Sequence, residues 1–134
     1  MLNNLHNDFR SLINSTEFKH EEGYLCNCFL MCDYEDLKSQ TWQFDFYNKN
    51  NDTITSYKDK EVLQKKSKVH KEAGKLIPEL KLSEVKISFK DALSEAQKEL
   101  KDSPKKIITL IQTIDKPIFN ISFITNTLKL VNVK

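Results

Sequence analysis

Three cysteines and three histidines are the residues in this sequence with the most versatile chemistry. Cys26, Cys28 and Cys32 lie within seven residues of one apolar segment. The histidines are dispersed along the chain: His6, His20 and His70. A structural zinc site usually draws four ligands from Cys-x2-4-Cys pairs, whereas the spacing here is Cys-x-Cys-x3-Cys without a second pair. Thiols in an apolar strand have a raised pKa and are poor nucleophiles. We therefore expect core cysteines, no catalytic residue and no metal; a thiolate site completed by His20 is the alternative.

Carboxylates form two short acidic runs that could also carry chemistry. Glu21 and Glu22 make up one run, and Asp33, Glu35 and Asp36 make up the other. Carboxylates act as a general acid and base when burial or a constrained neighbour separates their pKa values. Both runs fall between the predicted elements, so we expect solvated charge there.

The charge of the chain is unevenly distributed, although the net charge is only +2. Residues 1–57 carry four Lys/Arg and nine Asp/Glu, a net charge of −5, and residues 58–134 carry seventeen and ten, a net charge of +7. We call one lysine-rich set the basic segment: Lys58, Lys60, Lys65, Lys66, Lys68, Lys71 and Lys75. It could contact phosphates, but the lysines are accompanied by no arginine and no interleaved aromatic residue. We expect a charge-complementary protein contact or self-association before nucleic acid, with a solvated lysine face as the third alternative.

Length and composition narrow the class of protein. The 134 residues fit one compact domain. Two glycines, Gly23 and Gly74, cannot build a phosphate-binding loop or a dinucleotide fingerprint, because both need several glycines close together. The chain has no apolar run near the ~20 residues of a transmembrane helix, and its first residues lack the apolar stretch of a secretory signal. We expect a cytoplasmic domain with no cofactor and no membrane partner.

Periodicity in the first half predicts a helix followed by three strands. The apolar residues at helical spacing, over about the first eighteen positions, are Leu2, Leu5, Phe9, Leu12 and Ile13. Residues 24–32 are almost all apolar, which predicts a central strand buried on both faces, with the three cysteines on one face. Residues 41–47 alternate strictly, and residues 53–58 return after an Asn/Asp-rich turn, which predicts a hairpin.

The second half repeats this order after a basic stretch. Residues 59–74 favour a helix ended by Gly74, and Pro78 makes the following segment extended. Ser88 and Asp91 form a capping box for a helix. One face of that helix carries Phe89, Ala92, Leu93, Ala96 and Leu100. Three β-rich runs follow and predict a meander: 107–113, 117–125 and 128–133.

Both halves therefore share a helix, an apolar strand and a hairpin. An offset of 77 residues aligns two apolar sets, Trp42, Phe44, Phe46 and Ile54 with Phe119, Ile121, Phe123 and Val131. We predict an α+β protein made of two helix-plus-antiparallel-meander repeats, with the helices packed on one face of an antiparallel sheet. The first unit spans 1–58, a basic helix and extended linker span 59–86, and the second unit spans 87–134, together forming one compact domain.

The second unit resembles a known family. The stretch KISFKDALSEAQKEL, followed by IITLIQT and PIFNISFITNTLKLVNV, resembles PepSY domains over residues 86–133. The residues that carry the resemblance are Ile87, Ser88, Ala92, Ala96, Phe119, Ile121 and Phe123. The resemblance implies a helix followed by antiparallel strands, an extracytoplasmic setting and a module that binds or inhibits peptidases.

The sequence thus predicts a small non-catalytic binding module, with a protein or peptidase as its partner. The predicted binding surface is the sheet face without helices, which would present Gln43, Asp45, Tyr47, Asn120 and Ser122. A nucleic-acid-associated protein that uses the basic segment 58–75 is the alternative function.

Overall fold

A computed structural model describes residues 5–18, 23–59, 61–68, 77–100, 103–124 and 128–133. Its elements in chain order are α1 (Leu5–Ile13), β1 (Tyr24–Asp33), the 3-10 helix η2 (Tyr34–Ser39), β2 (Gln43–Asn48), β3 (Thr53–Lys58), β4 (Glu61–Lys68), the 3-10 turn η3 (Leu82–Glu84), α2 (Phe89–Gln97), β5 (Lys106–Ile114), β6 (Lys116–Ile124) and β7 (Leu128–Val133). Among these elements, no helix is long and apolar enough to cross a membrane.

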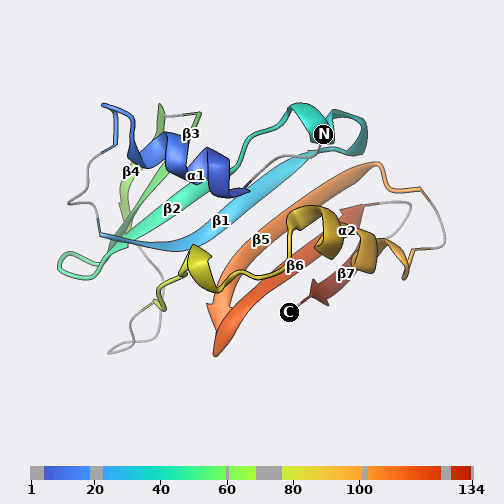
Figure 1. Ribbon diagram of the computed structural model, residues 1–134. Coiled ribbons are helices and arrows are strands. Elements are labelled where there is room, and N and C mark those ends of the chain that lie inside the picture. Colours follow the sequence, from blue (N-terminus) through green and yellow to red (C-terminus); the bar gives the residue numbers. More distant parts are fainter. Residues whose placement is uncertain are drawn as a thin grey trace.

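The strands form one sheet in the order β4-β3-β2-β1-β5-β6-β7 (Figure 1). All neighbouring strands pair antiparallel. The β1–β5 pair joins the first group of strands to the second, with Cys28 opposite Ile111. The predicted α+β class, the antiparallel sheet, the β2–β3 hairpin and the final meander are confirmed.

The predicted helix over 59–74 is wrong where the structure describes it, because residues 61–68 form strand β4. Its lysines and glutamates favour a helix only weakly, and helical propensity is easily outweighed by tertiary pairing. The edge of β3 supplies that pairing, with Val62 opposite Tyr57 and Ser67 opposite Ile54. The rest of the predicted helix, including Gly74, lies outside the described residues.

Strand β1 occupies the centre of the sheet as predicted, but its burial alternates. Cys28 and Leu30 are buried, whereas Met31 is 56% exposed. The prediction of burial on both faces was therefore wrong. The residues of β1 are apolar on both faces, but the side chains that are buried alternate with side chains that are at least partly exposed. A β-bulge between Leu25 and Asn27 also breaks the register, so Cys26 leaves the face that Cys28 shares with the core.

Helix α2 begins at the predicted cap. The Ser88 hydroxyl accepts a hydrogen bond from the backbone N–H of Asp91 at 3.1 Å. That bond satisfies one of the amide donors that a helix leaves free at its start. The predicted apolar face is confirmed, since Phe89, Ala92, Leu93 and Ala96 are buried and Leu100 packs against the core.

Both helices contribute to a single apolar core. In α1, Leu5 and Leu12 are buried, and the ring of Phe9 lies 5.3 Å from that of Phe44 in β2. The α2 residue Phe89 meets Trp42 edge-on at 5.1 Å. The core is thus continuous across the two halves of the chain.

Candidate functional site

The five residues predicted to bind lie on two strands that are not neighbours. Gln43, Asp45 and Tyr47 belong to β2, whereas Asn120 and Ser122 belong to β6. One row of paired residues runs across the sheet from β2 to β6, in the order Gln43, Phe29, Leu110 and Asn120. Because β1 and β5 lie between them, the two groups are about 14 Å apart.

Asp45 is committed to bonds within the sheet. Its carboxylate accepts one hydrogen bond from the Gln43 amide at 2.9 Å and a second from the Asn27 amide. Asp45 is also buried, so its charge is stabilised by these two amides. The three side chains form a polar cluster that holds β1 and β2 in register beside the bulge.

Tyr47 is fully buried and makes its contacts inside the protein. Its hydroxyl donates to the Asp52 carboxylate in the β2–β3 turn, and its ring meets Tyr24 edge-on at 5.7 Å. The bond to Asp52, with burial second, raises the pKa of Tyr47 to about 12. Its ring therefore offers no surface to a partner in this structure.

Sequence reasoning missed an apolar cluster between the two polar groups. We call it the outer patch: Phe29, Met31, Ile108 and Leu110. Phe29 pairs with Leu110 and Met31 with Ile108 across β1 and β5, so the four side chains share one face of the sheet. All four are at least partly exposed. The signal was present as alternate apolar residues of two predicted strands, of which residues 24–32 were interpreted as buried on both faces.

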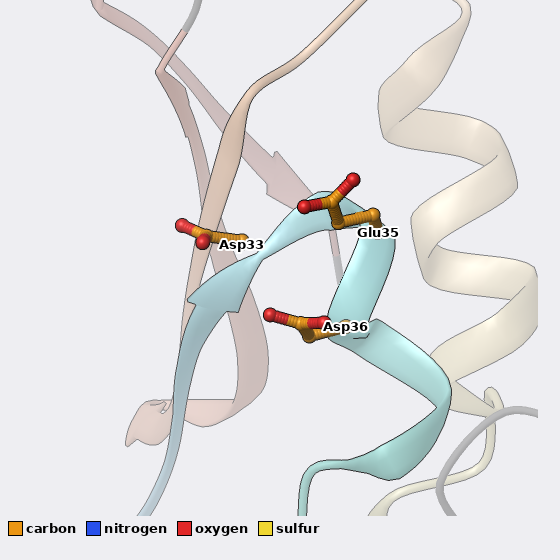
Figure 2. A group of neighbouring side chains, drawn as sticks. All are labelled: Asp33, Glu35 and Asp36. Carbon is orange, nitrogen blue, oxygen red and sulfur yellow. The ribbon is translucent and has the colours of Figure 1, made fainter.

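Three exposed carboxylates form the only group of potential metal ligands in the described part of the chain (Figure 2). Asp33, Glu35 and Asp36 have ligand atoms within 4.8 Å of one another, at the end of β1 and the start of η2. Asp33 also lies 3.7 Å from the ammonium of Lys106. All three remain solvated, so their geometry gives no reason to assign an ion.

The cysteines are free thiols in the interior of the protein. Burial is the largest cause that raises the pKa of all three; it takes Cys26 to about 12. The Cys26 thiol donates to the backbone carbonyl of Asp45 at 3.3 Å. Cys28 and Cys32 belong to the core cluster. These surroundings favour protonated, unreactive thiols, which agrees with the prediction of inert cysteines.

The histidines provide no base for these thiols in the part of the chain that is described. His6 belongs to α1, and its imidazole lies 3.1 Å from the carbonyl oxygen of Leu82 in η3. His20 and His70 lie outside the described residues.

Three of the seven lysines of the basic segment lie on strand β4. These are Lys65, Lys66 and Lys68, and among the described strands β4 is at the edge of the sheet, paired with β3 alone. Lys58 ends β3, and Lys60, Lys71 and Lys75 lie outside the described residues.

We expect filter-binding titrations to retain neither duplex DNA nor single-stranded RNA at about 0.15 M salt. The lysines of the basic segment are accompanied by no arginine and no stacking aromatic residue, both of which strengthen contacts to nucleic acids. Retention that falls steeply with salt, and that Lys65→Ala and Lys66→Ala together reduce, would instead favour the nucleic-acid alternative.

Comparisons with known proteins found no match. No family model matches the chain, and neither a curated protein nor a solved structure is similar to it at a significant level. The function must therefore be argued from the geometry of the molecule.

Proposed function

We propose that the chain is a non-catalytic protein-interaction module, and that the partner of its outer patch is a second copy of the chain. The observation that carries this proposal is the apolar centre of the sheet, where Met31 is 56% exposed between half-buried neighbours. Exposed apolar clusters of this kind on a sheet are typical of protein contacts.

The proposal includes the two-unit architecture expected from the sequence. Each unit contributes a helix and three strands, and the two helices cover the face opposite the outer patch. In support, Phe9 of α1 contacts Phe44 and Phe46, whose side chains alternate with those of the outer face. Helix α2 packs on β6 and β7, and its buried residues join the same cluster.

The charge around the outer patch favours a second copy. At one end, Asp33 forms an ion pair with Lys106 and lies beside the carboxylates of Glu35 and Asp36, so both signs of charge border the apolar residues there. At the other end the neighbours are the amides of Asn27 and Gln112, and the amide of Asn120 lies beside Leu110 on β6. A patch bordered by amides and by both signs of charge can meet the same patch of a second copy, as a two-fold symmetric contact requires.

The resemblance of residues 86–133 to PepSY domains fits this class of function. PepSY modules bind other proteins and are thought to inhibit peptidases. A peptidase is therefore the partner that the resemblance adds to the proposal.

Met31→Lys is expected to convert a dimer into a monomer, because a lysine ammonium at the centre of the contact must lose its water. Sedimentation velocity over a concentration series measures the change, and we expect the dissociation constant to rise by about tenfold or more. Ile114→Lys is the matched control: Ile114 is 58% exposed but lies at the β5–β6 turn, beyond the patch.

Two results would overturn the proposed contact. The first is a wild-type chain that stays monomeric over the whole series. The second is a dimer that Met31→Lys and Ile114→Lys weaken equally, since that dimer would not use the outer patch.

A further inference from the structure

The outer patch contains the most exposed sulfur-bearing side chain among the described residues. Met31 is 56% exposed, and it lies on the face of β1 opposite to the buried Leu30 and Cys32. A thioether has no proton to lose at neutral pH, so access to its sulfur decides how readily an oxidant reacts with it. Met31 is therefore open to oxidants from the solvent in the dissociated chain.

The other sulfur-bearing side chains that the structure describes are shielded. Cys26, Cys28 and Cys32 are between 0% and 9% exposed. Burial is the largest cause that raises the pKa of each thiol, and the protonated thiol reacts with oxidants far less readily than the thiolate. The second methionine of the chain, Met1, lies outside the described residues. An oxidant is therefore expected to react with Met31 before any of the cysteines.

Oxidation of Met31 by a peroxide is a two-electron step. A lone pair of the sulfur attacks one oxygen of hydrogen peroxide, so that an S–O bond forms and the O–O bond breaks. The departing hydroxide takes the proton of the transferred oxygen and leaves as water, so the sulfur is oxidised and the peroxide is reduced. The product is a sulfoxide, a polar group that a thiol-dependent methionine sulfoxide reductase converts back to the thioether.

The position of Met31 limits the effect of the added oxygen to the surface of the sheet. Met31 pairs with Ile108 across β1 and β5, and both side chains lie on the face opposite to the core. The oxygen is added near the end of the side chain, so the backbone pairing of β1 with β5 is retained. We therefore expect the sulfoxide form to be folded, with a polar group at the centre of its outer patch.

A polar centre conflicts with the contact proposed for this patch. The sulfoxide oxygen would lose its water against an apolar surface, and an acceptor buried without a donor is unfavourable. The contact also acts in the opposite direction, because a dimer that covers Met31 shields its sulfur from the oxidant. Association and oxidation therefore oppose each other.

We propose that Met31 is a reversible oxidation site that regulates the association of the chain through the outer patch. A two-electron oxidant of the peroxide class modifies the dissociated chain, and the sulfoxide keeps it dissociated until it is reduced. The effect on association rests on the proposed function, whereas the preference of the oxidant for Met31 over the thiols rests on the exposure of the side chains.

The test treats the full chain with hydrogen peroxide and locates the added oxygen by mass spectrometry of its peptides. We expect Met31 to take up one oxygen at least about tenfold faster than any of the cysteines. Sedimentation velocity should then give a dissociation constant raised by about tenfold or more, with an unchanged far-ultraviolet circular dichroism spectrum. Methionine sulfoxide reductase with dithiothreitol should restore the untreated dissociation constant.

The double variant Met31→Leu with Ile114→Met is the matched control, because it moves the thioether out of the patch. Ile114 is 58% exposed and lies at the β5–β6 turn. Each protein is compared with its own untreated form, so a difference in basal affinity does not affect the comparison. The double variant should take up an oxygen at position 114 and keep its untreated dissociation constant. Met1 and the cysteines are present in both proteins, so they cannot account for a difference.

The single variant Ile114→Met carries both thioethers in one chain, which distinguishes the failure of this inference from that of the proposed function. As the chain concentration rises, Met31 should be oxidised more slowly relative to the methionine at the turn, because the dimer covers Met31 alone. A chain that stays monomeric, or one that dimerises without this protection, overturns the proposed contact and the regulation with it.

Three results would overturn the inference while leaving the proposed contact intact. The first is a dimer that protects Met31 but forms as tightly after oxidation as before it. The second is oxidation of the cysteines ahead of Met31 in the dissociated chain. The third is an equal loss of affinity in the oxidised double variant, since that loss would not come from the outer patch.

Discussion

Gly23→Ala is expected to lower the free energy of unfolding by about 3 kcal/mol or more. Gly23 directly precedes β1 with φ at 110°, a conformation that residues with a Cβ rarely adopt. A Cβ built at this position would lie 2.0 Å from the carbonyl oxygen of Tyr47 and 2.6 Å from the carbonyl carbon. Both are backbone atoms of β2, so no rotation of a side chain relieves the clash, and the β1–β2 pairing must shift.

Urea unfolding followed by far-ultraviolet circular dichroism measures this loss. The variant Asp115→Ala separates its two causes, the strain of a positive φ and the clash with the backbone of β2. Asp115 also has a positive φ, of 65°, but it lies in an exposed turn. Its replacement should cost about 1 kcal/mol, the strain of the left-handed backbone alone. A Gly23→Ala variant that loses no more than Asp115→Ala would contradict the clash with β2.

Local signals made the second half of the fold predictable. The Ser88 cap, the apolar face of α2 and the left-handed Asp115 turn between β5 and β6 depend on residues close in sequence. Period-two alternation likewise identified β2, because Phe44 and Phe46 face the core while Gln43 is partly exposed. Each of these features depends on residues that lie within a few positions of one another in the sequence.

Features that depend on distant partners were not predictable from the sequence. Strand β4 forms because β3 offers an open edge, and the local sequence from Glu61 to Lys68 has no clear strand pattern. The bulge that separates Cys26 from Cys28 depends on how β1 meets β2, so parity alone placed the cysteines on one face. Pairing across the sheet, and not local preference, decides both cases.

The candidate sites were only partly predictable for the same reason. The polar residues of β2 and β6 were correctly assigned to strands, yet Tyr47 turns out to be buried against Tyr24 and bonded to Asp52. The outer patch joins Met31 of β1 to Ile108 of β5, which are far apart in the sequence. No spacing rule relates them, because the two strands meet only in the folded protein.

Raising the pH above about 9 is expected to destabilise the protein steeply, because its thiols are buried as neutral groups. Burial raises the pKa of Cys26 from 9.0 to about 12, and it raises the pKa of Cys28 well above 9.0. The unfolded chain therefore releases these protons first as the pH rises. The stabilisation is fully present below pH 9 and is lost progressively between 9 and the folded pKa values.

For Cys26 alone the slope is about 1.4 kcal/mol per pH unit above pH 9. Burial also raises the pKa of Tyr24, which adds a loss of the same sign at higher pH. Urea unfolding at a series of pH values from 7 to 11 measures the total slope. Cys26→Ala should be less stable at pH 7, since the bond to Asp45 is lost. Above pH 9, however, its free energy of unfolding should fall less steeply with pH than that of the wild type, by the contribution of the Cys26 thiol.

Ser122→Ala provides the control for this experiment, because it changes a half-exposed residue of β6 and keeps all three thiols. Its alkaline slope should equal that of the wild type. If Cys26→Ala also keeps the wild-type slope, the Cys26 thiol is not buried as a neutral group at the bulge. A thiol with an ordinary pKa at that position would reopen the cysteine chemistry that the buried, hydrogen-bonded geometry disfavours.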